Sequence, residues 1–203
     1  MKKRLAIAAA AVVLGSTLTP AQAALTGTVN KGVLTIATDN PAYSPWFDSN
    51  KPANGKGFES AVAYAVAKQL GYAPSQVKWV TATFDSVIQP GKKNYDFDIN
   101  QVSITPERQK AVDFSTGYYD VAQTVVALKS SKIAGAKTIA ALSAAKLGAA
   151  TGTTSLTAIT STIKTKAQPS VYNTNDLAVA ALSAKQIDGI VVDLPTAFYL
   201  SAT

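Results

Sequence analysis

The 203-residue sequence contains no cysteine and no histidine. Disulfides, thiolate or imidazole metal sites, cysteine nucleophiles and Ser-His-Asp triads are therefore excluded. Charged residues are only 15% of the chain and apolar residues 47%, a balance typical of a globular protein. No basic run or basic-aromatic pattern points to nucleic acid. We expect a globular protein with no cofactor, no metal and no nucleic-acid partner.

The first residues have the pattern of a secretory signal peptide. Lys2, Lys3 and Arg4 precede an apolar stretch over residues 5–14, and Ala21-Gln22-Ala23 is a small-x-small cleavage site. The apolar stretch is too short for a membrane span. We therefore expect cleavage after Ala23 and export, most simply to a periplasm. The exported chain has no cysteine for lipid attachment, and its net charge would fall from +7 to about +4.

Short β-branched runs alternate with Ala-rich stretches of helical length, which predicts βα units around a largely parallel sheet. The expected strands are 33–38, 77–81, 97–101, 122–128, 146–150, 171–172 and 187–192. The expected helices are 58–70, 84–88, 138–145, 155–164 and 176–185. In the first helix, the spacing predicts a core face made by Phe58, Val62, Ala65, Val66, Gln69 and Leu70.

Two series of such units, joined near residues 118–128, predict two lobes. We expect a signal peptide over residues 1–23, lobe 1 over residues 24–120 and lobe 2 over residues 121–203. A ligand would lie in the cleft between the lobes.

Arg108 is the only arginine beyond the leader, in the stretch Ser103-Ile104-Thr105-Pro106-Glu107-Arg108. A guanidinium matches a carboxylate with two parallel hydrogen bonds, which favours a carboxylate-binding role. The alternative is a surface arginine paired with Glu107 or Asp113. Ser103 follows a predicted strand, and ligands of α/β sheets bind at the carboxyl ends of strands. Thr105-Pro106-Glu107 also has the pattern of a helix start.

Further candidates follow other predicted strands. Gly152-Thr153-Thr154 precedes a helix, where free amides favour an anion but where many helices simply begin. Asp193 and Asp39 each end a strand, so each needs a cationic partner, such as a ligand ammonium, or a helix N-terminus. Aromatic residues near strand ends either line a pocket or cover core, namely Tyr43, Trp46, Phe47 and Phe84.

Seven stretches together resemble family 3 of the extracellular solute-binding proteins, and in particular the polar amino-acid receptors of ABC importers. In chain order they are Gly57-Phe58-Glu59, Tyr95-Asp96-Phe97-Asp98, Ser103 to Arg108, Val112-Asp113-Phe114-Ser115, Tyr118-Tyr119, Gly152-Thr153-Thr154 and Asp188-Gly189 to Asp193. The resemblance implies an α/β clamshell of two lobes, each a mixed, largely parallel sheet flanked by helices. It implies a monomer that closes on an L-amino acid and delivers it to a membrane-embedded permease.

The resemblance also implies roles for individual residues. Arg108 would bind the α-carboxylate with help from Ser103 and Thr154. The α-ammonium would be held by Asp193, Ser103 and the carbonyl of Gln101. Tyr43 and Phe84 would enclose the ligand side chain, and Asp39 or Asn40 would meet its far end.

Two departures from the family pattern leave alternatives open. The loop after Asp39 is one residue longer than usual, and Gln101 stands where a small residue is common. Family members also continue beyond this point to complete lobe 2 and return to lobe 1, so lobe 2 is expected to be incomplete. The alternatives are an enzyme resembling cyclohexadienyl dehydratases, which needs a placed acid, or a truncated chain that binds no ligand.

Overall fold

Two separate β-sheets form the framework of the computed structural model, which describes residues 27–202. The predicted signal peptide lies outside the described residues. The first sheet has three parallel strands in the order β2-β1-β3, namely β1 (Leu34–Thr38), β2 (Val77–Thr81) and β3 (Phe97–Asp98). Every residue of the central strand β1 is buried, as expected of a parallel strand covered on both faces.

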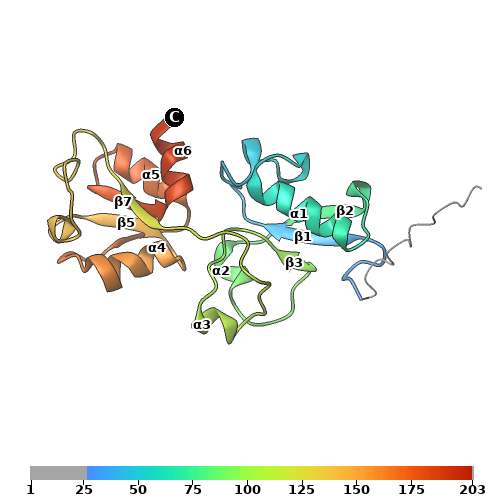
Figure 1. Cartoon of the computed structure of the whole chain (residues 1–203). Helices are drawn as coiled ribbons and strands as arrows, with labels where there is room; N and C mark the ends of the chain where they lie inside the picture. Colours follow the sequence, from blue (N-terminus) through green and yellow to red (C-terminus); the bar gives the residue numbers. More distant parts are fainter. Residues whose placement is uncertain (1–26, 203) are drawn as a thin grey trace, which may run out of the picture.

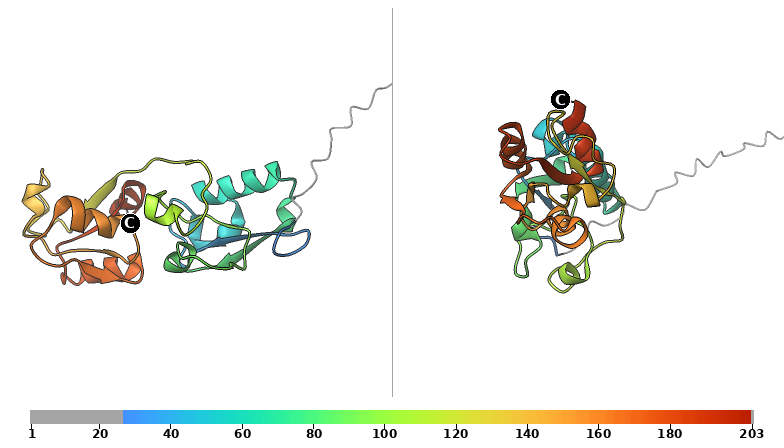
Figure 2. Two further views of the ribbon diagram at one scale, coloured as in Figure 1. Left: turned by 90° about the horizontal axis from the view of Figure 1, so that it is seen from below. Right: turned by 90° about the vertical axis from the view of Figure 1, so that its left-hand side faces the viewer.

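The second sheet has four strands in the order β4-β7-β5-β6. They are β4 (Gln123–Val126), β5 (Leu147–Ala150), β6 (Ser170–Tyr172) and β7 (Gly189–Asp193). Strand β4 runs antiparallel to β7, whereas the other pairs are parallel. The two sheets lie toward opposite ends of an elongated molecule, joined by an extended segment (Figures 1 and 2). The predicted α/β class with two mixed, largely parallel sheets is confirmed.

Helices flank both sheets. The longer ones are α1 (Phe58–Gln69), α5 (Asn175–Ser183) and α6 (Leu194–Ala202), and the short ones are α2 (Phe84–Val87), α3 (Pro106–Gln109) and α4 (Thr154–Thr157), which continues as the π-helix η5 (Ala158–Ile163). Single 3-10 turns are η1 (Asp48–Asn50), η2 (Pro52–Asn54), η3 (Pro74–Gln76) and η4 (Ala140–Leu142). Among these described helices, none has the length and apolar character needed to cross a membrane.

Two predicted elements are much shorter in the structure. The Ala-rich stretch 138–145 is not a helix but contains only the 3-10 turn η4, where Leu142 alone is buried. The helical propensity of this segment did not produce an α-helix, because the segment has no continuous apolar face that could pack against the rest of the protein. The strand predicted over 97–101 ends at Asp98, and Gln101 has a left-handed φ of 49°, which is incompatible with a continuing strand.

The core of the first lobe packs against a face of α1 that the sequence pattern did not predict. The buried residues of α1 are Glu59, Ser60, Ala63 and Ala67, whereas Phe58 and Val66 are 40% and 39% exposed. Ala65 and Gln69 are exposed as well. The predicted core face was therefore wrong at four of its six positions. The small side chains of Ser60, Ala63 and Ala67, at i, i+3 and i+7, let α1 approach the sheet closely, while Val62 and Leu70 pack at the margin.

The second sheet separates two apolar clusters, because alternate side chains of β7 point to opposite faces. Val191 belongs to the cluster that contains Leu147 and Ile159. Ile190 and Val192 belong to the cluster on the other face, which includes the buried side of α5. This alternation explains why the run Gly189-Ile190-Val191-Val192 is apolar throughout.

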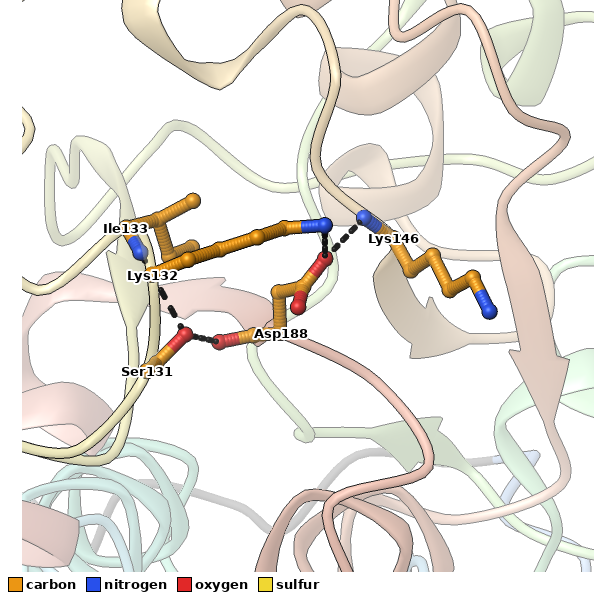
Figure 3. A network of polar contacts seen from close by, with 5 residues as sticks. All are labelled: Ser131, Lys132, Ile133, Lys146 and Asp188. Carbon is orange, nitrogen blue, oxygen red and sulfur yellow. Dashed lines mark hydrogen bonds and ion pairs between the residues drawn. The ribbon is translucent and has the colours of Figure 1, made fainter.

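Asp188 ties the long loop after β4 to the strands of the second sheet (Figure 3). Its carboxylate accepts a hydrogen bond of 2.6 Å from the amide of Lys146 and pairs with Lys132 Nζ at 2.9 Å. Its carbonyl accepts from the hydroxyl of Ser131 at 2.8 Å. Desolvation opposes ionisation, but the hydrogen bonds from Lys146 and Lys132 prevail and lower the pKa of Asp188.

We predict that Asp188→Asn lowers the free energy of unfolding by about 1–2 kcal/mol, because the Lys146 amide loses a charged acceptor. Lys132→Met should cost under about 1 kcal/mol, since the Lys132 side chain is 58% exposed. Urea unfolding checks both. Because folding lowers the pKa of Asp188, its contribution is present above the ordinary Asp pKa and is lost as the pH falls below it. Equal losses in the two variants would contradict this account.

Candidate functional site

A cavity of 340 Å³ lies between the two lobes, where the carboxyl ends of strands from both sheets meet. From the first lobe it is lined by residues that follow β1 and β3 and by the start of α2. From the second lobe it is lined by residues that follow β5, β6 and β7. This is the position where α/β sheets bind ligands. The lining residues include Asp39, Asn40, Tyr43, Phe84, Asp85, Asn100, Gln101, Thr154, Asn173, Asp193 and Thr196.

The structure brings six of the eight predicted site residues into this lining, namely Asp39, Tyr43, Phe84, Gln101, Thr154 and Asp193. The other two lie beside it. Ser103 Oγ is 3.2 Å from Thr154 Oγ1, and the guanidinium carbon of Arg108 is 5.3 Å from the ring centre of Phe84. Trp46 and Phe47, the other two aromatic candidates, are core residues of the first lobe.

Arg108 is buried, with 8% exposure, and its contacts differ from those of a surface arginine. Its Nη1 donates to the carbonyl of Ser103 and its Nη2 to the carbonyl of Gly152, both at 2.8 Å. Burial lowers the pKa of Arg108, while the charge of Asp193 opposes the shift. The alternative pairing with Glu107 or Asp113 is not observed among the ion pairs of residues 27–202. The predicted cap is confirmed, because Thr105 Oγ1 accepts from the Arg108 amide.

Asp193 ends β7 inside the cavity. Burial raises its pKa, whereas a hydrogen bond from Gln123 and the charge of Arg108 lower it. Gln123 Nε2 donates to Asp193 Oδ1 at 2.5 Å, and Gln123 Oε1 accepts from the hydroxyl of Ser155 at 2.6 Å. Gln123 was missed by the sequence analysis. Its position beside Asp193 follows from the antiparallel pairing of β4 with β7, which the sequence did not show.

The carboxylate of Asp39 accepts a hydrogen bond at the N-terminus of helix α2. A helix N-terminus was one of the two partners that the sequence predicted for it. Oδ2 accepts from the amide of Phe84, the first residue of α2, at 3.2 Å, and Oδ1 accepts from the amide of Asn40. Asp39 and Asn40 nevertheless both line the cavity. The carboxylate therefore has an internal partner and also contributes negative charge to the cavity.

Glu59 fixes the segment that connects the two lobes. Its buried carboxylate accepts from the Gln101 amide at 2.7 Å, from Gln101 Nε2, and from the hydroxyl of Tyr118 at 2.5 Å. Burial raises the pKa of Glu59, and these hydrogen bonds oppose the shift. The sequence analysis gave Glu59 no role, although its i+4 and i+8 neighbours are the small residues Ala63 and Ala67.

Asn100 is a lining residue that the sequence analysis missed. It is 7% exposed, and its Nδ2 has no hydrogen-bond partner within residues 27–202. Buried amides rarely remain unpaired, so this donor is available to a ligand in the cavity. Its place in a stretch predicted as regular strand concealed it.

Hydrogen bonds also join the lobes around the cavity. The indole Nε1 of Trp46 donates to Thr196 Oγ1 at 3.3 Å, and both residues are buried. The amide of Asp176 donates to the hydroxyl of Tyr43 at 3.3 Å. Gly152 has a left-handed φ of 68°, and a Cβ at this position would collide with the Asp85 carboxylate. The lobes are thus in direct contact at the cavity.

The cavity can recognise charge at several points. Its lining carries the carboxylates of Asp39, Asp85 and Asp193 but no lysine or arginine, and the guanidinium of Arg108 lies just behind Phe84. No group of three or more acidic residues within the described part of the chain is arranged to hold a metal ion. The site thus offers both carboxylates and, beside them, a guanidinium to a small charged ligand.

The sequence of residues 34–193 matches the family of bacterial extracellular solute-binding proteins, family 3. The chain is 35% identical over 96 residues to the arginine-binding extracellular protein ArtP of Bacillus subtilis, covering 47% of this chain and 36% of ArtP. It is 30% identical over 198 residues to the lysine/arginine/ornithine-binding periplasmic protein of Escherichia coli, covering 95% of this chain and 70% of that protein. The chain thus spans about a third of one relative and about two thirds of the other.

Solved structures of amino-acid-binding proteins are similar to this chain in fold as well as in sequence. An ancestral arginine-binding protein bound to glutamine has a TM-score of 0.71 at 27% identity, covering 85% of this chain and 74% of that one. The ancestral amino-acid-binding protein AncCDT-1, a precursor of cyclohexadienyl dehydratase, has a TM-score of 0.69 at 32% identity, covering 84% of this chain and 74% of that one.

We predict that Glu59→Gln lowers the free energy of unfolding by about 2 kcal/mol, because glutamine places an NH₂ donor where Glu59 accepts three hydrogen bonds. Tyr118→Phe removes one of these bonds from a side chain that is 43% exposed and should cost about 1 kcal/mol or less. Denaturant unfolding measures both. A Glu59→Gln variant as stable as the unmodified protein would show that the hydrogen bonds of the Glu59 carboxylate to Gln101 and Tyr118 do not stabilise the fold.

The Trp46 to Thr196 hydrogen bond provides a test of lobe contact in solution. In a double-mutant cycle of Trp46→Phe and Thr196→Val, we expect a coupling free energy of about 0.5–1.5 kcal/mol. Additive effects of the two substitutions would mean that the lobes are apart in the unliganded protein.

Proposed function

This chain belongs to the bacterial extracellular solute-binding proteins of family 3, and we propose that it is the amino-acid receptor of an ABC importer. It binds an L-amino acid in the cavity between its lobes and delivers it to a membrane permease. The observation that carries the proposal is the placement of buried Arg108 beside the cavity and of half-buried Asp193 in its lining, where the charge of each residue affects the pKa of the other.

The proposed binding mode follows from these two charges. Arg108 binds the α-carboxylate, because a guanidinium fork and a carboxylate pair through two parallel hydrogen bonds. Ser103 and Thr154, whose hydroxyls lie 3.2 Å apart, add donors at the same place. Asp193 and the carbonyl of Gln101 receive the α-ammonium. Each of these groups lies at or beside the cavity.

The remaining charges favour a ligand with a cationic side chain. Once Arg108 and Asp193 are paired with the α-groups, Asp39 and Asp85 leave the lining acidic. Tyr43 and Phe84 contribute aromatic faces, which attract cations. The arginine and lysine in the names of the two relatives agree with this choice. We therefore propose an arginine-like or lysine-like amino acid as the substrate.

Other parts of the proposal concern the context of binding. We propose export through the predicted signal peptide, function as a periplasmic monomer, and no catalysis. The similarity to AncCDT-1 makes a dehydratase the second candidate. Such an enzyme would turn over prephenate or arogenate, whereas a receptor would only bind its ligand.

A thermal-shift screen tests the proposal. The purified protein is heated with each standard L-amino acid, with prephenate and with arogenate. At a hundred times its dissociation constant, a ligand adds about 2.7 kcal/mol, which raises Tm by several degrees for a chain of this size. We expect the largest shifts with arginine or lysine. A cooperative transition that no amino acid moves would refute the receptor function, and turnover of prephenate would favour the enzyme.

The binding mode predicts which variants lose affinity. Arg108→Lys keeps the charge but loses the planar fork, and Asp193→Asn removes the carboxylate, so each should weaken binding by about 30-fold or more. Asp113→Asn removes an exposed carboxylate outside the cavity and serves as the matched control. Calorimetric titration gives the dissociation constants. Unchanged affinity in both cavity variants would refute this binding mode.

A further inference from the structure

Asp98 is a buried carboxyl group for which the proposed binding mode has no use. Both of its oxygens are inaccessible to solvent and have no hydrogen-bond partner in residues 27–202. Buried carboxylates are normally paired or hydrogen-bonded, because an isolated charge in a protein interior is very costly. An unpaired acid in the first lobe therefore requires an explanation.

Asp98 lies close to residues that line the cavity. It is the last residue of β3 and pairs in register with Ala37 of β1. Two residues beyond Ala37, the chain enters the cavity at Asp39, and two residues beyond Asp98 it enters the cavity at Asn100. Asp98 is thus two residues from the lining residue Asn100, and its charge interacts with that of the lining residue Asp39.

The charges around Asp98 are mainly negative. Glu59 of α1 and Asp39 both act on it unfavourably, and Lys93, from the loop before β3, is the cation that acts in the opposite direction. The ammonium of Lys93 is held elsewhere, because it donates to the carbonyls of Ser86 at 2.6 Å and Gln89 at 2.7 Å. The neighbouring hydroxyl groups of Tyr95 and Tyr118 also interact with the charge of Asp98.

These surroundings favour the protonated form of Asp98. Burial raises the pKa of Asp98 well above its ordinary value, and the charges of Glu59 and Asp39 add to the shift. Burial together with the charge of Asp98 raises the pKa of Tyr95 to about 12. Glu59 is the better acid of the pair to carry the charge, since it accepts three hydrogen bonds.

We propose that Asp98 exchanges its proton for the positive charge of a bound ligand side chain. When a cationic amino acid enters beside Asp39, its charge offsets the negative field at Asp98, whose O–H proton leaves to solvent as the carboxylate forms. This inference rests on the proposed function, because it requires a ligand in the same cavity. Ligand binding and proton release are then linked, so affinity for a cationic amino acid rises with pH.

The composition makes this linkage measurable. With no histidine and no cysteine, the chain has no side chain whose ordinary pKa lies near neutral pH, so carboxyls with raised pKa values are the acids relevant to this linkage. Within the described residues, these are Asp98, Glu59 and Asp193. Substituting Asp98 alone therefore distinguishes the proton that it releases from any protons released by Glu59 and Asp193.

The test is calorimetric titration with L-arginine in buffers of the same pH but different ionisation enthalpy, which gives the number of protons released per ligand. The intact protein should release a substantial fraction of one proton, and its affinity should rise by at most about tenfold per pH unit. Asp98→Asn should release fewer protons and show a flatter pH profile. Asp98→Leu repeats the test with an apolar side chain, in case the amide disturbs folding. Asp113→Asn, an exposed control, should behave as the intact protein.

L-glutamine provides a matched ligand, because it has the same α-groups and no side-chain charge. It should release fewer protons than arginine from the intact protein. Arginine binding with equal proton release in the intact protein and in both Asp98 variants would overturn this inference and leave the receptor function standing. If no amino acid binds to the intact protein, both the inference and the proposed function fail.

Discussion

The guanidinium of Arg108 is buried where the two lobes meet, and the arrangement of the cavity depends on how its charge is satisfied. One of its hydrogen bonds goes to Ser103 in its own lobe and the other to Gly152 in the second lobe. Asp193 supplies the opposing charge from the end of β7. Asp193 is half-buried, and its charge acts on Arg108 without a direct ion pair between them among the described residues. The hydrogen bonds of Arg108 to Ser103 and Gly152 join the two lobes beside the cavity.

In the first lobe, two acidic side chains, Glu59 and Asp98, are buried and interact with each other. Glu59 is fully hydrogen-bonded and anchors the connecting segment through Gln101 and Tyr118. Asp98 has no such partners. A sheet built from short parallel strands brings the ends of β1 and β3 together, so acids at these ends inevitably act on one another and on whatever occupies the cavity.

Sequence patterns predicted most elements and, together with the family resemblance, six of the lining residues, because strand ends in α/β folds meet at one edge. Sequence patterns failed where contacts between distant segments determine the local structure or the position of a side chain. The stretch 138–145 has helical propensity but no apolar face to bury, and α1 turns Ala63 and Ala67 inward instead of the larger Phe58 and Val66. Gln123 reaches Asp193 only through antiparallel pairing of strands 70 residues apart. No local pattern encodes that pairing.

The proposed function depends most on Arg108 and Asp193 holding the two α-groups of a cationic amino acid. The most direct measurement is a crystal structure of the protein with L-arginine. We predict that the ligand carboxylate lies within hydrogen-bonding distance of Arg108, that its α-ammonium lies at Asp193, and that its side chain lies between Tyr43 and Phe84 toward Asp39. An arginine bound in the reverse orientation, or bound outside this cavity, would contradict this binding mode.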